Sequence, residues 1–240
     1  MKTIQRTTSI LFCLIVFCLS ACKKDNTSEP APSQQERPGH IPGLGEEEGI
    51  PEGTEFKLPA GIKLTGSIVG DDYIYDGESC IVDGAGHYVT VSLPLENTTT
   101  VPITIEFPAG LIIISLSGDY QHGILLEKVI VTIPAKSGNP DNGGSSNGQC
   151  QATLMLSCLN IMKDPANSEA EFILGPVTSS ALIKDLLDKL SDKKILYSAY
   201  SDKTKFYETE SYVQDALWSI TDGTGLTEED LENIDRIPNK

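Results

Sequence analysis

The sequence has few basic residues. It contains 18 Lys and Arg against 34 Asp and Glu, a formal net charge of -16 over 240 residues. A surface this acidic repels nucleic acid and anionic lipid headgroups, which argues against a protein that binds polyanions. No nucleic acid partner is predicted. The charge alone does not say what the protein binds, because a solvated acidic surface explains it equally well.

Histidine is also scarce. None of His40, His87 and His122 stands at a ligand spacing from a cysteine, so no metal site and no cofactor is predicted. His87 and His122 lie beside glycines and are predicted in loops or at strand edges. The sequence has no Ser-His-Asp set in a supporting context, no phosphate-cradling glycine motif and no pair of carboxylates suited to catalysis. These absences speak against an enzyme.

The apolar run near the N-terminus, Ile10 to Leu19, is too short for a comfortable membrane span. Lys2 and Arg6 precede it, and the small pair Ser20-Ala21 separates it from Cys22. A positive start, an apolar stretch and small residues at the end are the order of an export signal peptide. Residues 1–21 are therefore predicted to be a signal peptide.

The end of this segment, Leu19-Ser20-Ala21-Cys22, resembles the lipobox of bacterial lipoproteins. The resemblance implies a diacylated Cys22 sulfur, cleavage before Cys22 and acylation of the new N-terminus. Acyl chains anchor a domain stably, since each buried methylene contributes about 0.8 kcal/mol. Lys23-Lys24-Asp25 also resembles the charged signals that some Gram-negative lipoproteins carry for surface export. The resemblances imply a lipid anchor in the outer membrane and a surface-exposed protein. The alternative is an ordinary secretory peptide in which Cys22 is incidental.

Composition divides the remaining chain. Residues 22–55 begin with Cys22, are rich in Pro, Glu, Gly and Ser, and are predicted to form a disordered tether. Residues 56–135 contain short alternating segments such as Val89 to Leu95 and Val129 to Ile133, which are typical of half-buried strands. Regular turns between such strands predict an immunoglobulin-like antiparallel sandwich.

Residues 136–149 are rich in Gly, Ser and Asn and are predicted to be a flexible linker, which separates two domains or interrupts one. After it, residues 150–240 begin with a strand-like segment and then show helical stripes at 179–190 and 213–220. Thr227 and Asp230 form a carboxylate variant of the capping box that opens a third helix. The chain is thus predicted to be mainly β with an α+β C-terminal part.

Three cysteines remain after the signal peptide and the lipid site, namely Cys80, Cys150 and Cys158. An odd number in an oxidising compartment leaves at least one thiol outside intramolecular disulfides. An extended strand between Cys150 and Cys158 would span about 26 Å, far beyond disulfide reach. Either this segment bends sharply or Cys158 has another partner.

The segment Val213-Gln214-Asp215-Ala216-Leu217-Trp218 has two interpretations. As an ordinary amphipathic helix it buries Val213, Leu217 and Trp218 and turns Gln214 toward solvent. Its pattern, apolar-Gln-X-X-apolar-Trp, also resembles the glutamine motif of the thioester domains of bacterial surface adhesins. In that family the glutamine side chain is joined to an earlier cysteine thiol with loss of ammonia.

The nearest match to the cysteine motif of that family is Leu156-Ser157-Cys158-Leu159-Asn160. Leu159 fits, whereas Ser157 stands where the family has a large apolar residue, and the interval from Cys158 to Gln214 is short. The resemblance implies a thioester between these two residues. Trp218, one helical turn after Gln214, would shield it from water.

The resemblance implies covalent capture, because an acyl thiol stays reactive toward amines. A lysine of a host or neighbouring surface protein would form an amide with Gln214 and free Cys158, once per molecule. Adhesion or binding at the cell surface is the function this implies. The rival is a noncovalent binding or structural lipoprotein without a thioester, and a secreted hydrolase is the weakest alternative.

Overall fold

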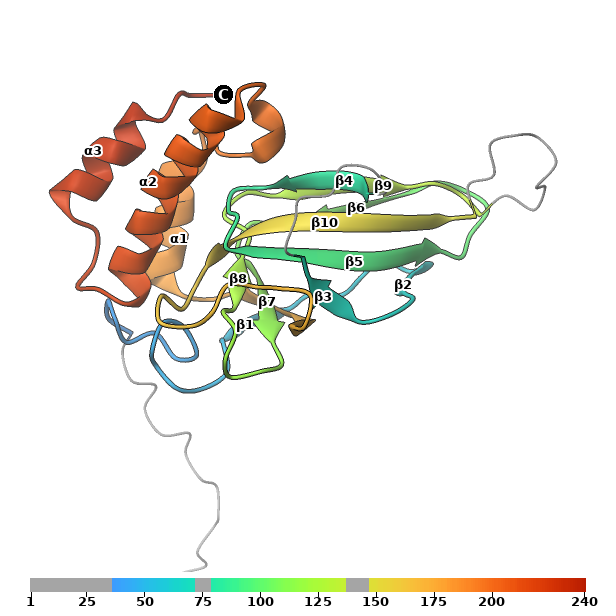
Figure 1. Cartoon of the computed structure of the whole chain (residues 1–240), viewed down its shortest axis with the longest axis horizontal. Coiled ribbons are helices and arrows are strands. Elements are labelled where there is room, and N and C mark those ends of the chain that lie inside the picture. Colours follow the sequence, from blue (N-terminus) through green and yellow to red (C-terminus); the bar gives the residue numbers. More distant parts are fainter. Residues whose placement is uncertain (1–35, 72–78, 137–146) are drawn as a thin grey trace, which may run out of the picture. The chain divides into compact units, whose positions relative to one another are not determined.

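The computed structural model describes residues 36–71, 79–136 and 147–240. The predicted signal peptide, the lipid site Cys22 and the first part of the predicted tether lie outside the described residues. The described residues belong to one compact unit, Gln35–Lys240. Its architecture is mainly β with three α-helices at the C-terminal end, as the sequence predicted in outline (Figure 1).

Strands fill the first two thirds of this unit and helices the last third. The strands are β1 (Gly53–Glu55), β2 (Ile62–Leu64), β3 (Ile68–Gly70), β4 (Ser79–Gly84), β5 (Val89–Asn97), β6 (Ile103–Phe107), β7 (Leu111–Ser115), β8 (Gly123–Ile124), β9 (Val129–Ile133), β10 (Gln149–Cys158) and β11 (Glu171–Thr178). The helices are α1 (Ala181–Leu190), the 3-10 turn η1 (Tyr197–Ala199), α2 (Lys203–Thr221) and α3 (Glu228–Arg236).

The main sheet closes on itself. Its path runs β5-β3-β11-β7-β8-β10, and β10 then pairs again with β5, so that six strands form a barrel-like ring. β4 extends the ring by parallel pairing with β10, while β6 and β9 form a separate antiparallel pair that contacts β4, β5 and β10. Alternate residues of β5 are almost fully buried in the core, as their spacing predicted. These are Val89, Val91, Leu93 and Leu95.

The predicted boundary between a sandwich at 56–135 and a separate unit at 150–240 does not hold. β10 pairs with β5 along eight residues, from Gln149 opposite Glu96 to Leu156 opposite Val89. β11 pairs with β7 and β3 in the same sheet. Both late strands therefore complete the ring that the earlier strands begin. Pairing between segments far apart in the sequence leaves no local signal, which is why the change of period looked like a domain boundary.

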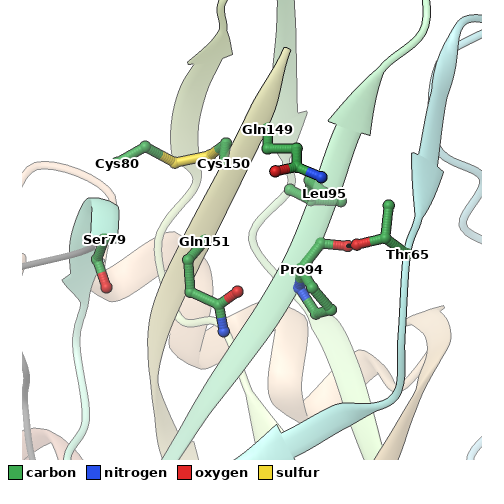
Figure 2. A pocket seen from close by; sticks show the side chains of 8 residues that line it. All are labelled: Thr65, Ser79, Cys80, Pro94, Leu95, Gln149, Cys150 and Gln151. Carbon is green, nitrogen blue, oxygen red and sulfur yellow. Dashed lines mark hydrogen bonds between the residues drawn. A yellow bond between two sulfur atoms is a disulfide. The ribbon is translucent and has the colours of Figure 1, made fainter. Parts of the chain in front are cut away.

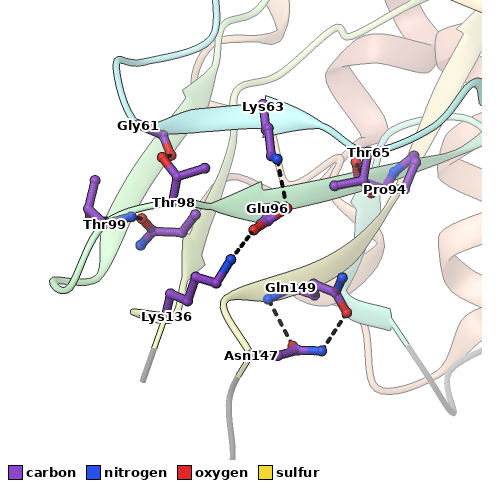
Figure 3. Close-up of polar contacts among 11 residues, drawn as sticks. Gly61, Lys63, Thr65, Pro94, Glu96, Thr98, Thr99, Lys136, Asn147 and Gln149 are labelled. Atoms are coloured by element: carbon purple, nitrogen blue, oxygen red, sulfur yellow. Dashed lines mark hydrogen bonds and ion pairs between the residues drawn. The ribbon is translucent and has the colours of Figure 1, made fainter. Parts of the chain in front are cut away.

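The predicted linker at 136–149 joins β9 to β10 within the unit. Residues 137–146 lie outside the described residues, but Lys136 and Asn147 on either side form an antiparallel bridge. Lys136 also pairs with Glu96 at 2.8 Å, and Lys63 holds the other oxygen of that carboxylate at 3.1 Å (Figure 3). These two partners lower the pKa of Glu96. Of the two alternatives for this segment, a loop that interrupts one domain agrees with the structure.

The predicted disorder of the tether does not extend to residues 36–55. Ile41 and Leu44 are buried beside the helices, and the backbone N–H of Gly45 donates to the carbonyl of Leu159 at 2.9 Å. Further along, β1 pairs with β11. Two large apolar residues are enough to anchor a segment whose average composition is that of a tether.

Three α-helices lie together at the end of the sheet where β10 finishes (Figure 1). Ser180 caps α1, and Asp202 caps α2, which begins earlier than the predicted stripe. The predicted capping box of Thr227 and Asp230 opens α3. α2 contacts α1, α3 and β10, so that its buried face meets the end of the central strand.

Cys150 forms a disulfide with Cys80, and Cys158 is a free, buried thiol. The strand between Cys150 and Cys158 does not bend back on itself, in agreement with the spacing argument. The bond joins β4 to β10, which are also neighbours in the sheet. It therefore reinforces an existing contact.

Candidate functional site

Cys158 is the last residue of β10, and its side chain has no exposed surface. Its register places it opposite Gly123 of β8. Burial raises the pKa of the Cys158 thiol to about 11, against the smaller opposing effects of the Trp218 indole and the Asn160 N–H. The thiol is therefore protonated at neutral pH and does not react readily with solutes. The N–H of Asn160 donates to the sulfur at 3.3 Å, a contact that would favour a thiolate when one forms.

Gln214 lies on the buried face of α2 and is 1% exposed. Its side-chain amide makes two hydrogen bonds with the backbone of Cys158. The N–H of Cys158 donates to Gln214 Oε1 at 2.7 Å, and Gln214 Nε2 donates to the carbonyl of Cys158 at 2.9 Å. This pairing joins the end of β10 to the middle of α2 and gives a partner to the N–H and the carbonyl of Cys158.

The structure thus brings together the two residues that the motifs single out, although 56 positions separate them. The interpretation in which Gln214 faces solvent is wrong. A helix that packs against a strand end has a wide buried face, and an amide is accepted there when its hydrogen bonds are made. The amide carbonyl is also polarised by the Cys158 N–H, which is the type of donor that stabilises an oxyanion on the same atom.

Trp218 is half-buried one helical turn after Gln214. Its ring packs beside Tyr88, with 5.4 Å between the ring centroids. The indole N–H lies near enough to Cys158 to lower the thiol pKa, yet among the described residues Nε1 has no hydrogen-bond partner of normal geometry. Its contact with the sulfur is therefore weak, because sulfur is a weak acceptor. The aromatic pair borders the Cys158–Gln214 contact.

His87 and Glu210 lie next to this pair and were not predicted as site residues. His87 is in the loop between β4 and β5, and its Nδ1 contacts Glu210 Oε2 at 2.9 Å. Glu210 stands four residues before Gln214 on α2, a spacing that places two side chains on one helix face. The i, i+4 relation was readable from the sequence, but the His87 partner was not, because it comes from a distant loop.

His122 links this region to the sheet. Its Nδ1 accepts a hydrogen bond from the Ser115 N–H at 3.1 Å, and its backbone bonds with Leu159 and Asn160, directly after Cys158. Burial, and secondarily the charge of Lys163, lower the pKa of His122 from 6.5 to about 4. The imidazole is therefore neutral in the folded protein at neutral pH.

Acid is expected to destabilise the protein through His122. The unfolded chain takes up a proton near pH 6.5 and the folded one only near pH 4, so the free energy of unfolding falls across this window, by at most about 3 kcal/mol. In His122→Asn the side-chain oxygen replaces Nδ1 as acceptor but does not titrate. Urea unfolding at about pH 7 and about pH 4.5 should show a smaller loss for this variant than for the wild type. Equal losses would contradict the assignment.

A hollow of about 490 Å³ lies elsewhere, beside the Cys80–Cys150 disulfide, where Thr65, Pro94 and Gln149 contribute to its wall (Figure 2). Cys150 and Cys158 lie at opposite ends of β10, so the hollow is about 26 Å from the buried pair. The chemistry suggested by Cys158 and Gln214 is not located in this hollow.

Within the described part of the chain, no helix combines the length and apolar character needed to cross a bilayer. In the same ranges, no group of three or more His, Cys, Asp or Glu is placed to hold a metal ion. Comparisons with protein-family models, with curated proteins and with solved structures found no match to this chain. The function is therefore argued from the site itself.

Proposed function

We propose that this chain is a lipid-anchored protein of the bacterial cell envelope, exposed at the surface of the outer membrane, which acts in adhesion or binding. Its reactive group would be an internal thioester between Cys158 and Gln214. The single observation that carries the proposal is the pair of reciprocal hydrogen bonds between the Gln214 amide and the Cys158 backbone. The anchor at Cys22 rests on the lipobox resemblance.

The proposed bond forms when the Cys158 sulfur attacks the side-chain carbonyl carbon of Gln214. The carbon–nitrogen bond of the amide then breaks, the nitrogen leaves as ammonia with the thiol proton, and a sulfur–carbon bond remains. The Cys158 N–H, already 2.7 Å from Gln214 Oε1, is placed to stabilise the charge on that oxygen during attack. Burial keeps water away from the product.

In capture, the nitrogen of a primary amine on a host or neighbouring surface protein attacks the same carbonyl carbon. An amide forms between that amine and Gln214, and the Cys158 thiol is released. The Asn160 N–H that donates to the sulfur supports its departure as a thiolate. Each molecule reacts once, so the proposal assigns no enzymatic turnover.

We also propose that the antiparallel strands correspond to an immunoglobulin-like sandwich, and that the end of β10 together with α2 corresponds to a thioester-domain-like unit. The barrel-like ring of six strands and the packing of α2 on β10 are compatible with this description.

The noncovalent alternative has an observation of its own. The Gln214 amide is hydrogen-bonded at both its oxygen and its nitrogen, and the thiol pKa is raised to about 11, so the same contacts can act as a structural latch. In that case the chain is a binding or structural lipoprotein whose Cys158 tolerates replacement by serine without loss of binding.

Intact mass separates the two alternatives. The residues after Cys22, purified without amines or reductant, are expected to weigh one ammonia less than the sequence with its disulfide. Methylamine should then add its whole mass, and peptide mapping should place it on Gln214. Cys158→Ser serves as the matched control, since its mass should show neither loss of ammonia nor addition of methylamine. A wild-type mass equal to that of the sequence with its disulfide would exclude the thioester and support the noncovalent alternative.

A further inference from the structure

Glu210 is a buried carboxylate with an incomplete set of partners. Its side chain is 2% exposed, and Oε2 pairs with His87 Nδ1 at 2.9 Å. Its other oxygen, Oε1, is buried and has no hydrogen-bond partner among the described residues. A buried carboxylate oxygen without a partner is costly, and such groups recur where chemistry requires them.

The position of Glu210 on α2 brings its carboxylate close to Cys158 and Gln214. Residues four apart on a helix lie about 5–6 Å apart at Cβ, so Glu210 and Gln214 share the face of α2 that meets Cys158. The charge of Glu210 raises the pKa of Cys158 as a minor contribution and that of Tyr88 as the second cause after burial. The carboxylate is thus close to the thiol in electrostatic terms.

His87 connects the buried carboxylate to the surface. Its side chain is 37% exposed, whereas that of Glu210 is enclosed. The ring lies against Tyr88, with centroids 4.2 Å apart, and edge-on to Tyr207, at 5.5 Å. These contacts hold the imidazole where one side meets Glu210 and the other meets solvent.

We infer that His87 and Glu210 form the proton relay of the Cys158–Gln214 site, an inference that rests on the proposed thioester. During formation, Glu210 Oε1 takes the Cys158 proton, directly or through one water, as the sulfur attacks Gln214. Glu210 then returns that proton to the departing nitrogen, which leaves as ammonia. No proton is gained or lost overall.

The same relay serves capture. A protein amine reaches the site as an ammonium ion and must lose a proton before its nitrogen can attack. His87, at the surface, carries that proton to solvent, and Glu210 accepts the second proton that the attacking nitrogen loses as the amide forms. This proton passes to the departing Cys158 sulfur, which needs one because its pKa lies at about 11. The carboxylate therefore ends as it began.

Other titratable groups surround the pair and belong in any interpretation of its pH dependence. They are Tyr88 from the same loop, Cys158 from β10, and Tyr207, Asp215 and Asp222 from α2 and its C-cap. Burial raises the pKa of both Asp215 and Asp222. A pH dependence of the reaction is therefore assigned to the relay only if it changes when His87 or Glu210 is replaced.

The test measures methylamine incorporation by intact mass against pH. Glu210→Gln keeps a hydrogen-bonding side chain but cannot take a proton, and His87→Gln keeps a donor to Glu210 but cannot pass one on. Glu208→Gln is the matched control, because it removes an exposed carboxylate from the same helix. Glu210→Gln is expected to slow incorporation about a hundredfold, and the pH profile of incorporation should change in both relay variants but not in Glu208→Gln. Unfolding midpoints are recorded for each variant to separate stability from rate.

The outcomes distinguish the two levels of the argument. A wild-type protein that never loses ammonia overturns the proposed function, and the relay with it. A wild-type thioester with unchanged rates and pH profiles in the relay variants overturns the relay alone. If the variants do not fold, the wild type alone still tests the relay. The pH dependence of its reaction with methylamine should differ from that of the reaction between methylamine and a small soluble thioester. A pH profile that follows amine ionisation alone overturns the relay.

Discussion

Replacing both Cys80 and Cys150 with alanine is expected to lower the free energy of unfolding by about 4 kcal/mol. The disulfide joins residues 70 positions apart, and a loop of that length restricts the unfolded chain by about this amount. Its location adds to the effect, because β4 contacts the ring through its parallel pairing with β10. Without the bond, β4 is held by that pairing and by its contacts with β9 and η1.

The measurement is denaturant unfolding of the wild type and of the double variant without reductant. The wild type treated with reductant should resemble the double variant, because Cys80 is exposed and the bond is accessible. Cys158→Ala should retain the disulfide and respond to reductant as the wild type does. A difference below about 1 kcal/mol between oxidised wild type and the double variant would mean that the unfolded chain is already restricted there.

The sequence predicted strands well where one face is apolar and the other polar. β5 and β9 each alternate, and the structure places them near the predicted positions. β11 was missed, since Gly175 and Pro176 interrupt it and proline is typical of turns. The ring tolerates them because the pairing of β11 with β7 shifts register between Leu174 and Val177. Local patterns do not contain this information.

The candidate site was partly predictable for a related reason. Two short motifs indicated Cys158 and Gln214, and the structure joins them through hydrogen bonds. His87 and Glu210 carry no motif, and each has an ordinary explanation in its own segment. Their contact depends on the β4–β5 loop reaching α2, which follows from the closure of the sheet rather than from either segment. The burial of the Glu210 carboxylate, which distinguishes this pair, arises only on folding and is not visible in the sequence.

In a chain without a thioester, the Cys158–Gln214 hydrogen bonds should contribute strongly to stability. Both hydrogen bonds use the backbone of Cys158, so Cys158→Ala removes the thiol and keeps the latch. This variant is therefore the correct background, because no thioester can form in it. Adding Gln214→Leu leaves a buried N–H and a buried carbonyl without partners. At about 1–3 kcal/mol for each group, the loss relative to Cys158→Ala is expected to be about 2–6 kcal/mol.

Denaturant unfolding of Cys158→Ala and of Cys158→Ala/Gln214→Leu measures this loss directly. Gln214→Glu in the same background gives a graded control. Its carboxylate still accepts from the Cys158 N–H but faces the Cys158 carbonyl without a donor, and it lies one helical turn from Glu210. It should fall between the two other proteins at neutral pH and approach Cys158→Ala in acid, where protonation restores a donor. A double variant within about 1 kcal/mol of Cys158→Ala would mean that water replaces the amide, and that the end of β10 does not depend on α2 for its position.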